Sequence, residues 1–352
     1  MSASSTAPRP VRARRLAASV LTGLGVAALV AGVAAPAFAD TGSTTPTPAP
    51  PVTTTKPVIR LAGGDRIGTA IDISQNTFPT PDTAKAVVLT AAYNFPDALA
   101  GAPLAAAKDG PVLLTDPGLL TPATLTEIER VAPTGSSVYI LGGPAAIATT
   151  IDASLTAAGY APQRIAGANR FETSVAIAQA LGSPTTVLLA TGDFFADALS
   201  AGPAAAAVHG AVLLTDGPVI PPAVAAYLSG LTSPTVYDIG DGAGKAYPSG
   251  ILVSGGDRFA TSALVAEKFF TNPTVVGVAT GWNFPDALAG AGAMGVKGGP
   301  VLLSDPVVLP SADALYLTNQ ASSITQALLF GGRASLSDAI ARTVSNQING
   351  VA

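Results

Sequence analysis

The segment VVLTAAYNFPDALAGAPLAAAKDGPVLLTDP (Val87–Pro117) decides the fold, because it occurs three times along the chain. It returns as VLLATGDFFADALSAGPAAAAVHGAVLLTDG (Val187–Gly217) and as VGVATGWNFPDALAGAGAMGVKGGPVLLSDP (Val276–Pro306). None of the copies contains an insertion, and two aspartates that recur in every copy are always 19 residues apart (Asp97 and Asp116, Asp197 and Asp216, Asp286 and Asp305). Such repetition predicts a protein built from three similar structural units.

Two shorter sequences flank each copy of this segment. An opening of the GGDR type precedes it as IRLAGGDR (Ile59–Arg66), QRIAGANR (Gln163–Arg170) and LVSGGDR (Leu252–Arg258). A hydrophobic, glycine-containing sequence follows it as VYILGGPAAI (Val138–Ile147), VYDIGDGAGKA (Val236–Ala246) and LLFGGRASL (Leu328–Leu336). We therefore divide the chain into repeats at residues 57–160, 161–249 and 250–352.

Apolar runs alternate with alanine-rich segments inside each copy. Runs of four to six residues, such as Val112–Thr115, end in Gly, Asp or Pro and are typical of buried parallel strands. Segments of about 12 residues, such as Pro96–Lys108, lie between them and are predicted to be helices. Strands that alternate with helices predict the α/β class, here as three tandem parallel-sheet repeat units.

The composition excludes several kinds of chemistry. The 352 residues include no cysteine and one histidine, so thiolate chemistry, Cys-bound zinc and His-rich metal sites are ruled out. That histidine, His209, aligns with Asp109 and Gly298 in the other copies, so no repeated site can use it. The net charge of −4 argues against nucleic acid as a partner. We expect neither a metal nor a cofactor.

The N-terminal 56 residues differ from the rest of the chain. Four arginines precede an uncharged stretch and the sequence Ala37-Phe38-Ala39, a pattern typical of a secretory signal peptide at residues 1–39. An uncleaved membrane anchor is the alternative interpretation. Residues 40–56 are rich in Pro and Thr and are predicted to be an extended linker or a disordered terminus. The remaining chain has no second long hydrophobic segment, so we expect an exported protein without a membrane span.

Two sets of repeated charged residues are candidates for binding. Asp97, Asp197 and Asp286 each follow a predicted strand and open a helix, at the edge where α/β sheets place ligands. The alternative is helix capping, with Asn94 and Asn283 as the caps and the aspartates favouring the helix dipole.

The second candidate set consists of arginines that precede a predicted helix, namely Arg66, Arg170 and Arg258. Three guanidinium groups could bind anionic groups on a polymer, or each could form an ion pair between repeats. Two carboxylates per repeat also suggest glycoside hydrolysis, but an enzyme needs one site with separately tuned groups. The second carboxylates (Asp116, Asp216 and Asp305) lie in Thr/Ser-Asp turns, which explain them locally.

Together, the GGDR-like openings, the NFPDALAG and PVLLTDP sequences and the hydrophobic-Gly-Gly endings resemble the bacterial cell-wall-binding repeat type 2 family. The resemblance covers roughly residues 58–341. It implies similar α/β units with pseudo-threefold symmetry, acting as non-catalytic anchors on the envelope of Gram-positive bacteria. It also implies an anionic secondary wall polymer as the partner, with peptidoglycan as the other wall polymer to consider. The second copy departs most from the pattern, because Ala168-Asn169 replaces Gly-Asp and Ala196 replaces Pro.

The sequence thus predicts a secreted, non-enzymatic protein that attaches non-covalently to the cell wall. The six candidate ligand-binding residues are the three arginines and the three aspartates Asp97, Asp197 and Asp286. A wall hydrolase, either an amidase or a glycosidase, and a self-assembling surface-coat protein are the alternatives. The excess of acidic side chains is unusual for a protein that binds an anionic polymer, and requires local arginines or bridging cations.

Overall fold

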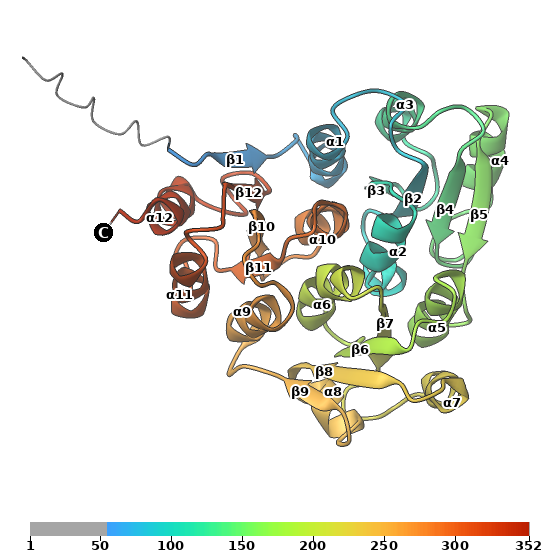
Figure 1. Ribbon diagram of the computed structural model, residues 1–352. Coiled ribbons are helices and arrows are strands. Elements are labelled where there is room, and N and C mark those ends of the chain that lie inside the picture. The colour runs from blue at the N-terminus through green and yellow to red at the C-terminus, as the bar shows by residue number, and fades with distance from the viewer. Residues whose placement is uncertain (1–54, 352) are drawn as a thin grey trace, which may run out of the picture. The chain divides into compact units, whose positions relative to one another are not determined.

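Three parallel sheets of four strands each carry the fold in the computed structural model, which describes residues 55–351 (Figure 1). One sheet contains β2 (Ala86–Ala91), β3 (Val112–Thr115), β4 (Ser137–Leu141) and β5 (Ala161–Ile165), in the order β3-β2-β4-β5. The second contains β6 (Thr186–Thr191), β7 (Ala211–Thr215), β8 (Thr235–Ile239) and β9 (Ile251–Val253), in the order β7-β6-β8-β9. The third contains β1 (Val58–Leu61), β10 (Val275–Thr280), β11 (Val301–Ser304) and β12 (Gln326–Phe330), in the order β1-β12-β10-β11.

This architecture confirms the prediction of three parallel-sheet α/β units. The proposed signal peptide at 1–39 lies outside the described residues, as does most of the linker at 40–56. Within residues 55–351, no helix combines the length and the apolar character that crossing a bilayer requires.

Each sheet takes one strand from the opening of another repeat. Strands β5 and β9 follow the boundaries drawn at 160/161 and 249/250, yet they pair in parallel with β4 and β8 of the preceding repeat. Strand β1 opens the first repeat and pairs with β12 of the last one, with Ile59 opposite Leu328. The three units are therefore joined into a closed ring by main-chain hydrogen bonds.

The helices fall into three groups by what they contact. Inner helices pack on one another: α2 (Gly101–Ala107), which follows the short 3-10 helix η1 (Pro96–Ala98), α6 (Ala196–Ala207) and α10 (Pro285–Lys297). Junction helices each contact two units: α1 (Arg66–Thr77), α5 (Arg170–Ala180) and α9 (Arg258–Phe269). The remaining helices follow the third or fourth strand of a sequence repeat: α3 (Pro122–Val131), α4 (Thr150–Ala157), α7 (Pro222–Gly230), α8 (Gly240–Ala246), α11 (Ser311–Asn319) and α12 (Asp338–Asn349).

The polar residue before each opening arginine starts a junction helix. Asp65 accepts a hydrogen bond from the backbone N–H of Gly68, and Asp257 accepts one from Ala260. Asn169 takes the same place in the second repeat and accepts from two backbone N–H groups. These side chains satisfy N–H groups that the first helical turn leaves without partners. The Asp/Asn-Arg dipeptide therefore places each arginine at the first position of a junction helix.

Small residues let the three inner helices meet closely at equivalent positions. A Cβ atom on Gly202 would lie 2.8 Å from the Cβ of Ala102 and 3.9 Å from that of Ala291. One continuous apolar core, which includes residues of all three units, surrounds this point, and each unit has a smaller outer core of its own. Close contact between alanine and glycine surfaces explains why a chain with 5% aromatic residues buries a large core.

Candidate functional site

Three equivalent cavities lie at the carboxyl ends of the strands, where two repeats meet. Each is formed by the loop around the NFPD sequence, the glycine-containing end of the same unit, and the opening of another repeat. We name them by their aspartate and arginine: the Asp97–Arg170, Asp197–Arg258 and Asp286–Arg66 cavities. Their volumes are about 270, 240 and 240 Å³, respectively. All six candidate residues from the sequence thus line three small cavities, and every cavity combines residues of two repeats.

A backbone carbonyl fixes each arginine at its cavity. Nη1 of Arg66 donates to the carbonyl of Ala92 at 2.9 Å, and Nη1 of Arg258 donates to that of Gly281 at 2.7 Å. Arg170 makes the equivalent hydrogen bond to the carbonyl of Gly192. A guanidinium has five N–H donors, so each arginine retains donors beyond this bond.

Three phenylalanines of the repeated NFPD sequence meet where the inner helices begin. The ring centroids of Phe95, Phe195 and Phe284 are 5.4 to 6.2 Å apart in all three pairs. Each arginine lies over one of these rings: the distance from Cζ to the centroid is 5.8 Å for Arg66–Phe284 and 5.9 Å for Arg170–Phe95. Arg258 lies 5.8 Å from the centroid of Phe195. These cation–π contacts join one repeat to the next and hold the guanidinium groups around a common centre.

The aspartates lie in the first turn of η1, α6 and α10, as the helix-dipole interpretation expects. The capping prediction for the neighbouring asparagines is wrong. The helices begin at Pro96 and Pro285, so the N-cap residues are Phe95 and Phe284, and neither has a side-chain cap hydrogen bond. Phe195 holds the same position before α6. Capping therefore does not explain the Asn residues of the NFPD sequence.

The glycines that end each unit make room for the aspartates. Gly142, Gly240 and Gly331 have φ angles of +115°, +83° and +111°, a conformation that favours glycine. A Cβ atom on Gly240 would lie 2.1 Å from Oδ2 of Asp197, and one on Gly331 would lie 2.3 Å from Oδ2 of Asp286. The glycine in the closing sequence is thus required by the carboxylate that faces it.

Burial changes the acidity of two of these carboxyl groups. Desolvation raises the pKa of Asp197 to about 6; Arg258 opposes this shift and Asp241 adds to it. Desolvation also raises the pKa of Asp286, against hydrogen bonds from Ser335 and Thr69 and the charge of Arg66. The ion pairs within 4 Å found in residues 55–351 do not include an arginine with the aspartate of its cavity. The charges of Arg258 and Arg66 act on Asp197 and Asp286 across their cavities without a direct ion pair.

The scan against family models supplies the family of this fold. The model described as "Cell wall binding domain 2 (CWB2)" matches the chain three times, at residues 60–152, 164–243 and 253–341. The chain belongs to the CWB2 family. The three matches correspond to the three repeats of the sequence, so the predicted resemblance is confirmed.

Curated relatives of this CWB2 chain come from Bacillus subtilis (strain 168). "N-acetylmuramoyl-L-alanine amidase LytC" is 27% identical over 299 residues, which cover 83% of this chain and 59% of LytC. "Amidase enhancer" is 30% identical over 257 residues, which cover 72% of this chain and 35% of that protein. The chain therefore spans between one third and six tenths of the length of these relatives.

Solved structures from Clostridium difficile share the fold. Cwp8 superposes with a TM-score of 0.74 and 25% identity, covering 83% of this chain and 52% of Cwp8. Cwp6 also has a TM-score of 0.74, with 22% identity, and covers 87% of this chain and 51% of Cwp6. In both comparisons the match extends over about half of the solved protein.

Exposed aromatic residues beside the CWB2 cavities were missed by the sequence analysis. Tyr93, Phe194 and Trp282 are 59%, 66% and 56% exposed and lie in the loops that follow β2, β6 and β10. Tyr93 and Trp282 occupy equivalent positions, whereas Phe194 is displaced by one residue, so no repeated motif marks the three. The scarcity of aromatic residues in the chain was the signal that could have drawn attention to them.

Other predicted features have structural roles in this CWB2 chain. Oδ1 of Asp116 accepts a hydrogen bond from the backbone of Gly118, and Oδ1 of Asp305 accepts from Val307 and Val308, as the turn interpretation expects. His209 has a φ of +50°, and its equivalents Asp109 and Gly298 also have positive φ angles. A hollow of about 490 Å³ lies near the carboxyl ends of the inner helices. Its lining includes Pro103, Ala106, Leu181, Ala206, His209 and Gly295.

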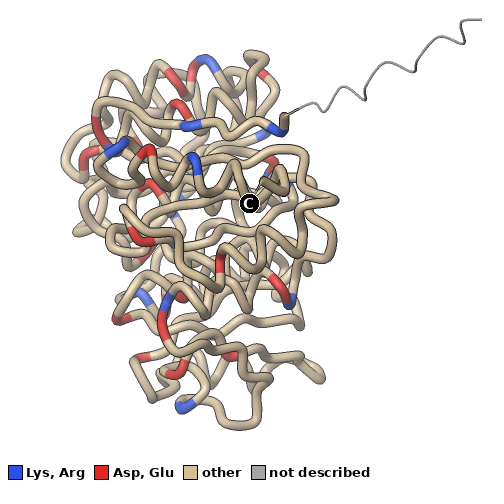
Figure 2. The backbone as a smooth tube through the Cα atoms, turned by 90° about the vertical axis from the view of Figure 1, so that its left-hand side faces the viewer, with Lys and Arg blue, Asp and Glu red and all other residues tan. Residues whose placement is uncertain are grey.

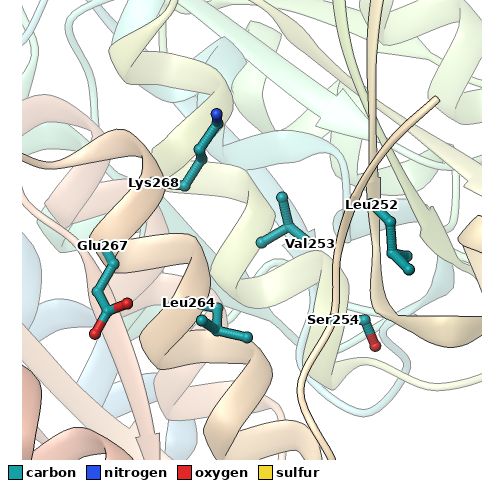
Figure 3. Close-up of a pocket in the computed structure, with 6 residues that line it drawn as sticks. All are labelled: Leu252, Val253, Ser254, Leu264, Glu267 and Lys268. Carbon is teal, nitrogen blue, oxygen red and sulfur yellow. The ribbon is translucent and has the colours of Figure 1, made fainter.

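One further hollow, of about 350 Å³, lies between β9 and α9 (Figure 3). Leu252 and Leu264 face it from the two elements, with Lys268 farther along the helix. Leu252 takes the position of Arg60 and Arg164, whose guanidinium groups donate to carbonyls at Gly331 and Gly142. The lining of this hollow is therefore not repeated at this position in the other two repeats.

Proposed function

We propose that this protein is a secreted, non-catalytic module that attaches non-covalently to the cell wall through its three Arg–Asp cavities. The observation that carries the proposal is the placement of one arginine and one aspartate of different repeats in each cavity. A polymer with a repeating chemical structure can occupy several equivalent cavities of one protein. Such multivalent attachment gives a stable complex even when each site is weak.

The arginines favour an anionic secondary wall polymer as the partner. Each guanidinium is oriented by a carbonyl and an aromatic ring, and its remaining donors can form charge-assisted hydrogen bonds with a phosphate or carboxylate. Figure 2 shows basic and acidic positions of residues 55–351 interspersed along the backbone in that view. The attraction must therefore come from local arginines rather than from an overall positive field.

The repeated carboxylates support a non-catalytic role. Asp116 and Asp305 accept hydrogen bonds from the backbone of turns and do not line the cavities, so the two carboxylates of the repeated segment are not paired as an acid and a nucleophile. LytC is named as an amidase, but the chain covers only 59% of that protein. Wall hydrolysis is the second candidate, and zymography of the purified protein on wall preparations tests it: a cleared band would favour the hydrolase.

The location follows from the proposed binding. A signal peptide at residues 1–39, cleaved after Ala39, would deliver the module outside the cell. The Pro/Thr-rich segment at 40–56 would then act as an extended spacer of a module that is held near a surface. We therefore place the protein at the cell wall of a Gram-positive bacterium. N-terminal sequencing of the exported protein would give Asp40 as its first residue if this proposal holds.

Co-sedimentation with purified walls tests the proposed function. The chain from residue 40 to 352 is expected to sediment with native walls and to stay in solution after hydrofluoric acid has removed phosphodiester-linked polymers. If the protein bound treated walls as well as native walls, its partner would be peptidoglycan rather than the anionic polymer. A protein that sediments with neither preparation would contradict wall binding itself.

A further inference from the structure

The three cavities share a plan but differ in the groups that border them. One aromatic side chain lines the Asp197–Arg258 cavity, and a second lies on its arginine. Phe194 lines it directly, and the ring of Trp282 lies 4.6 Å from Cζ of Arg258. The Asp286–Arg66 cavity has Asn283 in place of the first aromatic and Tyr93 in place of the second.

The Asp97–Arg170 cavity is polar at the same positions. Asn94 lines it where Asn283 lines its neighbour, and Asp193 replaces the second aromatic in the sequence. The aromatic character of the cavities therefore rises from Asp97–Arg170 through Asp286–Arg66 to Asp197–Arg258.

Trp282 is held in position although more than half of it is exposed. Its Nε1 donates to Oδ2 of Asp305 at 3.0 Å, and its ring meets Phe259 edge-on at a centroid distance of 5.6 Å. Phe194 is 66% exposed and comes from the loop on the Asp197 side of the cavity. Large apolar rings that remain in water beside a cavity provide surface that a ligand can cover, with little loss of side-chain freedom.

The charges of this cavity oppose the binding of an anion. Asp197, Asp241 and Asp257 all line it, against the single guanidinium of Arg258. Asp241 accepts a hydrogen bond from the Ser254 hydroxyl at 2.6 Å, and a carboxylate can accept further bonds. Acceptor groups that outnumber donors fit a ligand rich in hydroxyl groups. The Asp97–Arg170 cavity, with Asp97 as its one carboxylate, is a better match for an anionic group.

We propose that the Asp197–Arg258 cavity binds an uncharged sugar ring of the wall polymer, which stacks on Trp282 and Phe194. The hydroxyl groups of that ring donate hydrogen bonds to the carboxylates of Asp197 and Asp241, and Arg258 donates to its oxygen atoms. This inference rests on the proposed function, and it assigns different parts of the polymer to different cavities. The most aromatic cavity takes the neutral ring, and the least acidic cavity takes the anionic group.

Trp282 is the only tryptophan of the chain, so tryptophan fluorescence reports on the surroundings of this ring, which lies on Arg258. The probe is the uncharged oligosaccharide fraction that hydrofluoric acid releases from purified walls, collected as the flow-through of an anion-exchange column. We expect a saturable change in the fluorescence of the full chain on titration with this fraction. The Phe194→Ala variant should need roughly tenfold more saccharide for half saturation, because truncation of a contact aromatic commonly weakens binding by this factor or more.

Leu315→Ala is the control, because it removes a similarly exposed apolar side chain from α11 that lines none of the three cavities. It should leave the midpoint of the titration unchanged. Wall co-sedimentation adds a second measurement, in which Trp282→Ala should bind less than wild type while Trp282→Phe, which keeps a stacking ring, retains binding. The thermal unfolding midpoints of all variants show whether they are folded.

Three results would overturn the inference: no fluorescence response of the wild type, an equal effect of Leu315→Ala and Phe194→Ala, or unaltered wall binding by Trp282→Ala. Wild-type protein that sediments with walls but fails these tests contradicts the sugar site and leaves the proposed function intact. Wild-type protein that responds to the saccharide but does not sediment contradicts wall attachment instead.

Discussion

The guanidinium of Arg66 lies 5.8 Å from the ring centroid of Phe284, although the arginine opens the first repeat and the phenylalanine belongs to the third. The same relationship links Arg170 to Phe95 and Arg258 to Phe195. Each repeat therefore supplies the ring on which the arginine of another repeat lies. Wall binding and ring assembly share these residues, and mutations can separate the two roles.

Replacing the cavity arginines should reduce wall binding more than it reduces stability. Each single change to alanine (Arg66, Arg170 or Arg258) is expected to weaken co-sedimentation, since a charge-assisted hydrogen bond contributes roughly 1.5–3 kcal/mol. The triple variant should lose binding completely. Arg333→Ala is the control, because Arg333 is exposed and pairs with Asp338 outside the cavities. If the triple variant bound walls with an unchanged isotherm, the arginines would not be part of the binding site.

A phenylalanine packed in the three-ring cluster should contribute more to the free energy of unfolding than an exposed phenylalanine does. Phe284→Ala removes two ring contacts and the surface beneath Arg66, so we expect the free energy of unfolding to fall by about 2–3 kcal/mol. Phe194→Ala truncates an exposed ring and should change stability by less than about 0.5 kcal/mol. Urea denaturation followed by circular dichroism measures both. Equal losses from the two variants would contradict the packing role of Phe284.

Adjacent glycines in the closing sequence of the third repeat should respond differently to alanine. Gly331 has a φ of +111°, and a Cβ there would lie 2.3 Å from the Asp286 carboxylate, whereas a Cβ on Gly332 meets nothing within 4 Å. We expect Gly331→Ala to lower the free energy of unfolding by at least about 1–3 kcal/mol, and Gly332→Ala to be nearly neutral. Thermal denaturation of the two variants tests this, and a neutral Gly331→Ala would show that the cavity wall can move.

Asp238 on β8 should make the protein less stable as the pH rises. Its carboxyl is buried, both oxygens lack hydrogen-bond partners within residues 55–351, and burial raises its pKa to about 6 from 3.8. Between these two values the folded protein holds a proton that the unfolded chain has lost, so stability falls as pH increases through this window. A difference of about two units corresponds to a loss of up to roughly 3 kcal/mol above pH 6.

The variant Asp238→Leu should remove the part of the pH dependence that Asp238 contributes. An aliphatic side chain suits this position, because Ile140 and Leu329 occupy the equivalent strand positions. It is expected to be more stable than wild type at pH 7.5, with a smaller difference at pH 4. Unfolding midpoints recorded across this range provide the measurement. Parallel pH profiles for the two proteins would show that Asp238 is not the titrating group.

The local elements of the fold could be predicted because their signals are local. Short apolar runs such as Val112–Thr115 and alanine-rich segments such as Pro285–Lys297 form strands and helices wherever the chain places them. The pairing of β1 with β12 has no such signal, because it joins the first strand of the fold to the last one. The asparagine caps were predicted wrongly, because the helices begin at Pro96 and Pro285 and the preceding phenylalanines take the N-cap position.

For the candidate site, too, the local features could be predicted from the sequence, whereas the contacts between repeats could not. Repetition indicated the six charged residues, and their positions at the carboxyl ends of the strands follow from the general behaviour of α/β sheets. The combination of Asp197 with Arg258, or of Asp286 with Arg66, depends on contacts between repeats that periodicity does not encode. Exposed aromatics such as Trp282 escaped the motif search because the copies differ at those positions.

The exchange of opening strands sets a minimum size for a working unit. One repeat alone has a free sheet edge on one side and an unpaired opening strand on the other, and it carries only half of any cavity. Two repeats can complete one cavity, but they still leave one sheet edge free and one opening strand unpaired. Three are the smallest number that closes, whether they are fused in one chain or contributed by three separate chains. An unfused ancestor with this geometry would therefore have worked only as a homotrimer, with its binding sites at the subunit boundaries.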